Sequence, residues 1–172
     1  MTRLAPRLAL GLLLALLTVS PARADGPTAI GNFRNWNGYT YTENGKKVCF
    51  MATKPTRTLP AGVTRGDIYA MITHRPGENS NGVISIVTGY TYKSNSDVQV
   101  TIGNQRFSLF TDGDTAWARD EATDRALVAA IKGGSTMTVA GTSSRGTKTT
   151  DTYSLAGSSA AYQAISQQCG LR

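Results

Sequence analysis

The sequence contains few of the residues on which active sites and metal centres usually depend. Its 172 residues include one histidine, His74, and two cysteines. A structural zinc site needs a full set of histidine and cysteine ligands, and a serine hydrolase needs a base beside its nucleophile. No stretch reads Gly-x-Ser-x-Gly, and no glycine-rich phosphate-binding loop follows a predicted strand. We therefore predict no catalytic residue, no metal site and no cofactor.

Long apolar runs are absent after the first two dozen residues. Within those, two arginines precede an apolar run over residues 8–17, and the pattern Ala-Arg-Ala follows at 22–24. A membrane-spanning helix needs about 20 apolar residues, so this shorter run is typical of a secretory signal peptide. We expect a signal peptide over residues 1–24 and one domain over residues 25–172 without a transmembrane segment. The expected location is the periplasm or the cell exterior.

Concentrated charge is lacking as well. The whole chain has 18 Lys and Arg residues against 11 Asp and Glu residues, and three of the arginines fall in the expected signal peptide. The mature chain therefore has a net charge of +4, and its cations are scattered singly apart from Lys46 and Lys47. Because nucleic-acid-binding proteins concentrate cations in a patch, we predict no nucleic-acid partner. The surplus favours solubility, with weak attraction to anionic lipid or polysaccharide as the alternative.

The two cysteines, Cys49 and Cys169, are far apart in the sequence. In an oxidising compartment, two cysteines in one small domain usually pair, so we predict a disulfide between them. Closing so long a loop stabilises the fold by up to about 4–5 kcal/mol in the chain-entropy description. Two buried free thiols are the alternative.

Short alternating runs separated by turn residues dominate the rest of the chain, which predicts a mostly antiparallel β protein. Asn44-Gly45 is a strong two-residue hairpin signal, and residues 76–82 are predicted to form a loop. In the segment 97–102 the even positions are apolar and the odd positions polar. The predicted strands cover residues 39–42, 47–52, 67–76, 83–90, 97–102, 106–110, 115–118, 136–142 and 147–155.

Two segments have helical spacing instead. Residues 123–134 place apolar side chains on one stripe, begin with Thr123 or Asp124 as the cap, and end at a Gly-Gly pair. The second helix starts near Ser158, the predicted N-cap, and ends at Gly170. It is short and poor in large apolar residues, so the predicted disulfide would hold it against the first hairpin.

The segment SSRGTKTTDTYSL, residues 143–155, is rich in hydroxyl groups. Gly146 favours a turn here, and the even positions from 148 to 154 are all polar. The simplest interpretation is therefore a hairpin tip and an outgoing strand with one solvated face. The competing interpretation is a polar recognition surface made by Arg145, Lys148 and Thr150, which we take as the candidate partner-binding residues.

Several motifs occur together in one order along the chain: VCFMATKP, ITHRP, GYTYK, VTIGNQRFSLFTDGDTAWA and LVAAIKGGSTMTVAGTSSRGTKTTDTYSLAG. Together they resemble the invasion-associated locus B family of exported proteobacterial proteins. The resemblance implies an immunoglobulin-like antiparallel β-sandwich, to which the two short helices predicted above would be added. It also implies a periplasmic or outer-membrane-associated location in the cell envelope and, in pathogens, a contribution to the invasion of host cells. It supplies no catalytic residue.

Two functional hypotheses follow. The first is a non-enzymatic envelope protein that binds an unknown macromolecule of the envelope or of a host surface. The second is a hydrolase of envelope polymers that uses His74 or the paired acids Asp112 and Asp114. The sequence favours the first, because one histidine and two paired cysteines leave little for a catalytic site. It leaves the oligomeric state open.

Overall fold

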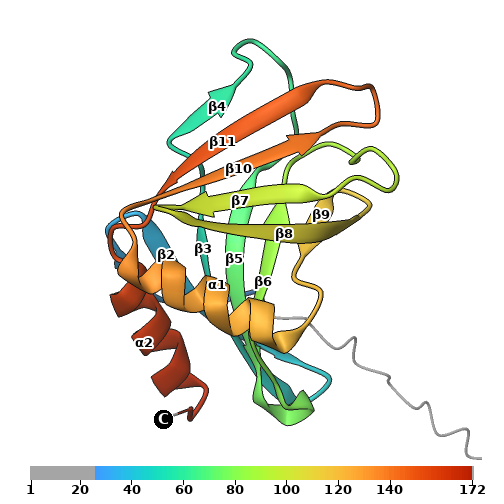
Figure 1. Ribbon diagram of the computed structural model, residues 1–172. Coiled ribbons are helices and arrows are strands. Elements are labelled where there is room, and N and C mark those ends of the chain that lie inside the picture. Colours follow the sequence, from blue (N-terminus) through green and yellow to red (C-terminus); the bar gives the residue numbers. More distant parts are fainter. Residues whose placement is uncertain (1–25, 172) are drawn as a thin grey trace, which may run out of the picture.

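Alternating polar and apolar residues place about half of the described residues in antiparallel strands (Figure 1). The computed structural model describes residues 26–171, so the predicted signal peptide lies outside the described residues. The strands are β1 (Thr28–Phe33), β2 (Trp36–Glu43), β3 (Lys46–Thr53), β4 (Arg57–Leu59), β5 (Tyr69–Arg75), β6 (Ser80–Val87), β7 (Val98–Ile102), β8 (Gln105–Asp112), β9 (Thr115–Trp117), β10 (Thr136–Thr142) and β11 (Lys148–Ser154).

The hydrogen-bonded order is β1-β2-β3-β5-β6-β9-β8-β7-β10-β11-β4. The first half of this order forms one layer, and β8, β7, β10, β11 and β4 form a second layer that crosses in front of it in Figure 1. The pairing of β8 with β9 joins the layers. The prediction of a mostly β, antiparallel sandwich with two helices is confirmed.

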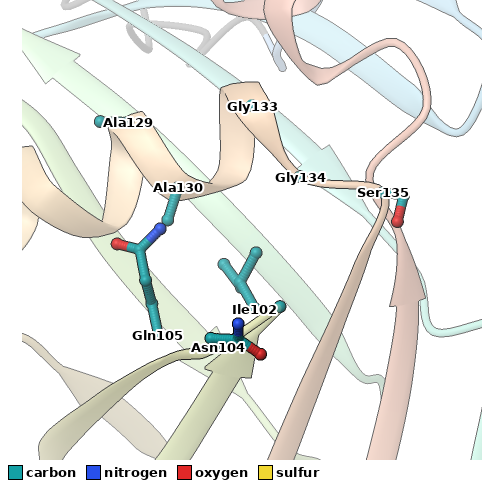
Figure 2. Close-up of a pocket in the computed structure, with 9 residues that line it drawn as sticks. Ile102, Asn104, Gln105, Ala129, Ala130, Gly133, Gly134 and Ser135 are labelled. Atoms are coloured by element: carbon teal, nitrogen blue, oxygen red, sulfur yellow. The ribbon is translucent and has the colours of Figure 1, made fainter.

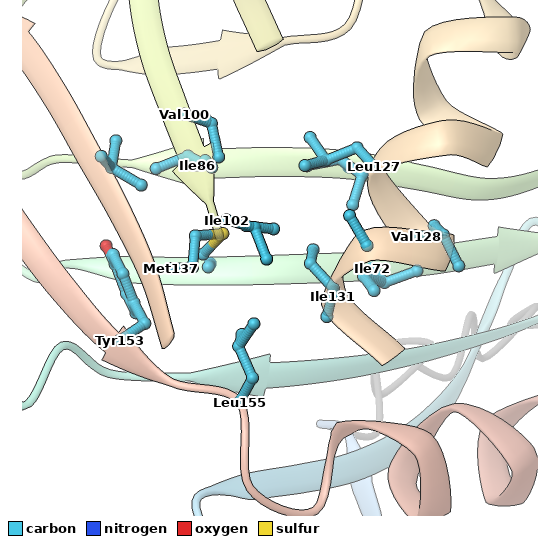
Figure 3. Packing of buried hydrophobic residues seen from close by; sticks show 14 of the residues in the cluster. Ile72, Ile86, Val100, Ile102, Leu127, Val128, Ile131, Met137, Tyr153 and Leu155 are labelled. Carbon is cyan, nitrogen blue, oxygen red and sulfur yellow. The ribbon is translucent and has the colours of Figure 1, made fainter. Parts of the chain in front are cut away.

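Apolar side chains from both layers and from the first helix meet between the sheets (Figure 3). The predicted inward phase of the strand at 97–102 is correct, since Val98, Val100 and Ile102 are buried. The buried residues labelled in Figure 3 are Ile72, Ile86, Val100, Ile102, Leu127, Val128, Ile131, Met137, Tyr153 and Leu155.

Two strands were not predicted from the sequence. β1 reads TAIGNF, in which glycine and asparagine interrupt the alternation, and β4 has only three residues. The predicted loop at 76–82 was partly wrong, because only Pro76–Glu78 forms a short 3₁₀ turn and β6 already begins at Ser80. Both edge strands of the sheet, β1 and β4, are therefore elements that only the paired sheet stabilises.

Helix α1 (Glu121–Gly133) begins two residues before its predicted start. Asp120 is the N-cap, and its carboxylate accepts a 2.7 Å hydrogen bond from the Thr123 amide, which lowers the pKa of Asp120. The predicted cap at Thr123 or Asp124 was wrong. Asp124 instead accepts a 2.8 Å hydrogen bond from the Ile84 amide, which has no strand partner on the β9 side of β6. Burial raises the pKa of Asp124.

Helix α2 (Ser158–Gln168) also differs from its predicted start. Its N-cap is Gly157, with a φ of 93°, and a Cβ there would lie 1.9 Å from the Phe33 carbonyl oxygen. The chain can approach β1 this closely only with glycine at that position. Ser158 is therefore not the cap. Its hydroxyl donates a 2.8 Å hydrogen bond to the Ile131 carbonyl and so links the two helices.

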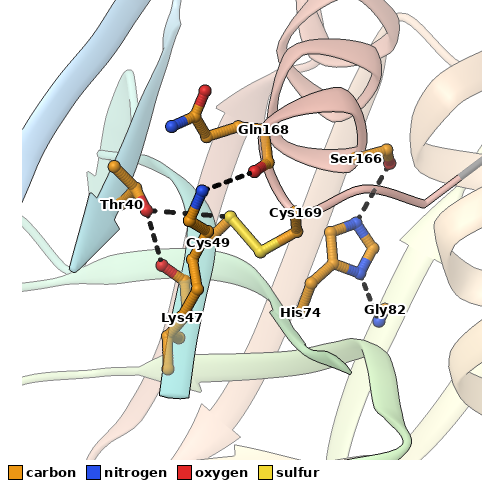
Figure 4. Close-up of a disulfide and its surroundings, with 9 residues drawn as sticks. Thr40, Lys47, Cys49, His74, Gly82, Ser166, Gln168 and Cys169 are labelled. Atoms are coloured by element: carbon orange, nitrogen blue, oxygen red, sulfur yellow. Dashed lines mark hydrogen bonds between the residues drawn. A yellow bond between two sulfur atoms is a disulfide. The ribbon is translucent and has the colours of Figure 1, made fainter. Parts of the chain in front are cut away.

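The predicted disulfide between Cys49 and Cys169 is confirmed, and it joins β3 to the end of α2 (Figure 4). The hairpin predicted at Asn44-Gly45 is confirmed as well, with Glu43 opposite Lys46. Within residues 26–171, no helix is both long and apolar enough to cross a membrane.

Candidate functional site

Strand β11 has two chemically different faces. Lys148 is exposed and Thr150 and Thr152 are half-buried, whereas Thr149 and Asp151 between them are buried. The solvated face that the sequence predicts for this strand is therefore present. Its buried polar face was not predicted.

Strand register extends the solvated face of β11 to its two neighbours. Thr150 lies opposite Leu59 of β4 on one side and Ala140 of β10 on the other. Thr152 lies opposite Arg57 in the same way. We call this surface the outer edge face, and its members are Arg57, Leu59, Thr138, Ala140, Thr142, Lys148, Thr150 and Thr152.

The outer edge face is positively charged. Arg57 and Lys148 are exposed, and neither has an ion pair within residues 26–171. None of the eight positions is a carboxylate, because the one acid of β11, Asp151, points inward. Two of the predicted partner-binding residues, Lys148 and Thr150, thus share a face that lacks opposing charge.

The third predicted residue, Arg145, lies in the turn between β10 and β11. It lines a hollow of about 260 Å³ formed where this turn meets residues 63–65 and 89–91. Tyr90, Ser144 and Thr149 line the same hollow. Arg145 is exposed just beyond the Lys148 end of β11, and the hollow beside it is lined by Thr149 of the buried face of that strand.

A buried ion pair lies beneath this end of the molecule. Two guanidinium nitrogens of Arg65 donate 2.7 Å hydrogen bonds to the two carboxylate oxygens of Asp151. The Nε of Arg65 donates a third hydrogen bond to the Thr88 carbonyl. The two side chains are 6% and 1% exposed. Burial alone would lower the pKa of Arg65, but the hydrogen bond and the charge of Asp151 outweigh it and raise the pKa.

The backbone around Arg65 is held by a close glycine contact. The Gly66 amide donates a 2.9 Å hydrogen bond to the Gly89 carbonyl, and a Cβ at Gly89 would lie 2.5 Å from the Gly66 oxygen. The guanidinium also lies 5.0 Å from the centre of the Tyr90 ring. The segment before β5 is thereby fixed against both β11 and the segment after β6.

Three tyrosines surround the ion pair. Tyr90 shares a 2.6 Å hydrogen bond with the Thr149 hydroxyl, and burial raises its pKa. Tyr92 and Tyr153 are buried, with no hydrogen-bond partner for either hydroxyl among the described residues, and burial raises the pKa of both. The sequence signal for this cluster was Asp151 itself, an acid in the inward phase of an amphipathic strand.

His74 is a structural residue in the described fold (Figure 4). Its Nδ1 accepts a 3.0 Å hydrogen bond from the Gly82 amide, so the ring proton of the neutral form is on Nε2, which lies 3.1 Å from the Ser166 hydroxyl. Burial lowers its pKa to about 4. In this tautomer Nε2 donates to Ser166 and cannot take its proton, so the His74–Ser166 pair lacks the base that a hydrolase needs.

The paired acids of the second hypothesis lie elsewhere. Asp112 and Asp114 are exposed at the turn between β8 and β9, and the Thr115 hydroxyl donates a 2.9 Å hydrogen bond to Asp114. Across the part of the chain that the structure describes, no group of three His, Cys, Asp or Glu side chains could hold a metal ion. The structure places His74 on β5 and these acids on a separate turn.

A hollow of about 690 Å³ lies between the β7–β8 turn and the end of α1 (Figure 2). It is bordered by Asn104 and Gln105 on one side and by Ala129, Gly133 and Ser135 on the other. None of its lining side chains is ionisable. It therefore offers neither an acid nor a base, and we do not take it as the candidate site.

Comparison with known proteins agrees with the motifs. The model of the invasion associated locus B (IalB) protein family matches residues 36–166. The chain belongs to the IalB family. A search of curated proteins finds no match.

Among solved structures, the chain is similar to the crystal structure of invasion associated protein b from Bartonella henselae, with a TM-score of 0.56 and 17% sequence identity over 82% of this chain and 97% of that chain. At this identity the similarity shows the fold that this IalB chain shares with it.

Proposed function

We propose that this IalB protein is an exported, non-enzymatic protein of the cell envelope that binds a macromolecular partner through the outer edge face and Arg145. The partner belongs to the envelope or to a host surface. In a pathogen, this binding would contribute to the invasion of host cells, as the name of the Bartonella henselae protein suggests.

The observation that carries this proposal is the charge of the outer edge face. Arg57, Arg145 and Lys148 are exposed without ion-pair partners among residues 26–171, beside strand positions that hold no carboxylate. Complementary charge accelerates encounter with a partner and excludes like-charged competitors. Cations that only maintain solubility need no such segregation from acids.

The packing beneath the face supports the same function. The Arg65–Asp151 pair, the Gly66–Gly89 contact and the Tyr90–Thr149 hydrogen bond fix the inner side of β11 and the adjoining loops. Because β11 is held from within, its outward side chains lose little freedom on binding. A prearranged surface of this kind suits recognition.

Export is supported by the predicted signal peptide and by the Cys49–Cys169 disulfide, since disulfides persist in oxidising compartments. We therefore place the protein in the periplasm or outside the cell, with the outer membrane as the adjoining surface.

Cross-linking in intact cells, followed by mass spectrometry, tests the proposal. We expect the variant R145A/K148A/T150A to keep its melting temperature and to lose the cross-linked partners of the native protein. The matched control is R125A/K47A/T42A, which removes the same charges from exposed positions on α1 and the β2–β3 hairpin. If the first variant keeps all partners, or if the control loses them equally, the outer edge face is not the binding surface.

A further inference from the structure

Exposed apolar side chains are concentrated next to the outer edge face. Within residues 26–171, the exposed large hydrophobic side chains are Leu59, at 39%, and Val63, at 45%. Both belong to the segment that ends β4 and continues into the following loop, where every residue from 59 to 64 is exposed. In Figure 1 this segment projects at the top of the molecule, beyond β11.

The charges around this segment that have no ion-pair partner among the described residues are all positive. Arg57 is two residues before Leu59, and Thr150, which faces Leu59, is two residues from Lys148 on the same side of β11. Val63 and Arg145 line the same hollow.

The neighbouring carboxylates are already neutralised. Asp151 is paired with Arg65, and Asp67 lies 3.5 Å from Lys54. We call the group of Arg57, Leu59, Val63, Arg145 and Lys148 the corner. It combines two apolar side chains with three cations that have no partner among the described residues.

We propose that this corner docks on the surface of an anionic phospholipid bilayer, with Leu59 and Val63 entering the region between head groups and acyl chains. Arg57, Arg145 and Lys148 would then contact lipid phosphates. This inference rests on the proposed function, because it names the partner that the outer edge face contacts.

The two apolar side chains favour a bilayer over a soluble polyanion. A polyanionic polysaccharide would engage the cations and leave Leu59 and Val63 in water, whereas a membrane interface removes the two apolar side chains from water and places the cations next to lipid phosphates. Each cation near an anionic membrane surface raises the binding constant about fivefold. Neither contribution requires a membrane-spanning helix.

Vesicle co-sedimentation tests this inference with the exported protein, whose intact mass shows whether residues 1–24 have been removed. The probes are vesicles of phosphatidylethanolamine with phosphatidylglycerol and vesicles of phosphatidylcholine alone. We expect binding to the first and at least tenfold weaker binding to the second. Added salt should weaken the binding, because the phosphate contacts are screened.

Three variants separate the contributions. L59S/V63S keeps every charge and should lower the binding constant about tenfold. R57Q/R145Q/K148Q keeps the apolar pair and should lower it about a hundredfold, by the fivefold effect of each cation. The control R34Q/R125Q/K47Q removes as many cations from exposed positions away from the corner and should lower it much less.

Several results would overturn the inference: equal binding to both kinds of vesicle, no binding to anionic vesicles, or equal effects of the corner and control variants. Vesicle binding can fail while the partners cross-linked in cells still depend on Arg145 and Lys148. In that case the lipid assignment is wrong and the proposed function stands with a different macromolecule. If the cross-linked partners do not depend on these residues either, both proposals fail.

Discussion

Two links between distant segments stabilise the fold, and they differ in their chemistry. Near the C-terminus, the Cys49–Cys169 disulfide joins segments 120 residues apart, and it lies beside the hydrogen-bonded His74. Near β4 and β11, the Arg65–Asp151 ion pair joins segments 86 residues apart. In Figure 1, the C-terminus and β4 lie at opposite ends of the molecule.

The disulfide and the ion pair act on different states of the chain. In the chain-entropy description, the disulfide stabilises the fold by restricting the unfolded chain, so it acts even before β3 and α2 have packed. The ion pair exists only in the folded protein, and its two charges have lost their water. The disulfide should therefore raise the free energy of unfolding. Removing one partner of the ion pair should lower that free energy strongly, but replacing both partners with apolar residues should change it little.

Removing the disulfide should give the largest effect. We expect C49A/C169A to lower the free energy of unfolding by up to about 4–5 kcal/mol, since the loop it closes spans 120 residues. Urea unfolding of the variant and of the native protein with and without reductant measures the change. An unchanged midpoint after full reduction would show that the cross-link does not stabilise this fold.

Breaking one half of the ion pair should have a slightly smaller effect. D151A leaves the buried guanidinium of Arg65 without its carboxylate, and we expect a loss of about 3–5 kcal/mol. The double variant R65M/D151L removes both charges and should recover most of that loss. If the double variant is as unstable as D151A, the ion pair stabilises the fold in its own right, and the contrast with the disulfide disappears.

Acid should weaken the disulfide end through His74. Its pKa is 6.5 in the unfolded chain and about 4 in the fold. As pH falls below 6.5 the unfolded chain binds a proton first, so stability that is complete above pH 6.5 is lost as pH approaches 4. The loss is about 3 kcal/mol.

Unfolding measured from pH 7 to pH 4 in native protein and in H74Q tests this effect. We expect the slope between these values to be shallower in H74Q. Asp124 acts in the opposite sense, because its pKa is raised by burial, and its contribution is common to both proteins. Equal slopes would mean that His74 is not the group responsible.

The sequence predicted the disulfide but not the ion pair, for a physical reason. Two cysteines in one small domain allow a single intramolecular pairing, so Cys49 and Cys169 could be paired without knowledge of the fold. Alternation along β11 puts Asp151 in the inward phase, but Arg65 is one of many cations, and only the folded chain brings it beside this acid. The strands with clear alternation were predictable, whereas β4 depends on its pairing with β11.

The same reason limits what could be predicted about the site. Lys148 and Thr150 could be assigned to one solvated face, because alternation along a single strand is visible in the sequence. Arg57 and Leu59 join that face only through the pairing of β4 with β11, and Val63 meets Arg145 only through the loops. Contacts between distant segments were the missing information.

The smallest effects should come from the tyrosines around the ion pair. Y90F removes the 2.6 Å hydrogen bond to Thr149 and leaves that buried hydroxyl unsatisfied, so we expect a loss of about 1 kcal/mol. Y153F is the matched control, because the Tyr153 hydroxyl is buried with no partner among the described residues. Removing a buried hydroxyl that makes no hydrogen bond costs nothing, so Y153F should be as stable as the native protein or more stable.

Thermal unfolding of both variants at neutral pH measures the difference. A clear loss in Y153F would reveal that its hydroxyl is satisfied by a bound water, since a solvated hydroxyl contributes a hydrogen bond that phenylalanine cannot replace. The ion-pair end would then contain a wet polar network, and its two charges would be less desolvated than those of an isolated pair. In that case D151A should also lose less than about 3 kcal/mol, because water could take the place of the missing carboxylate.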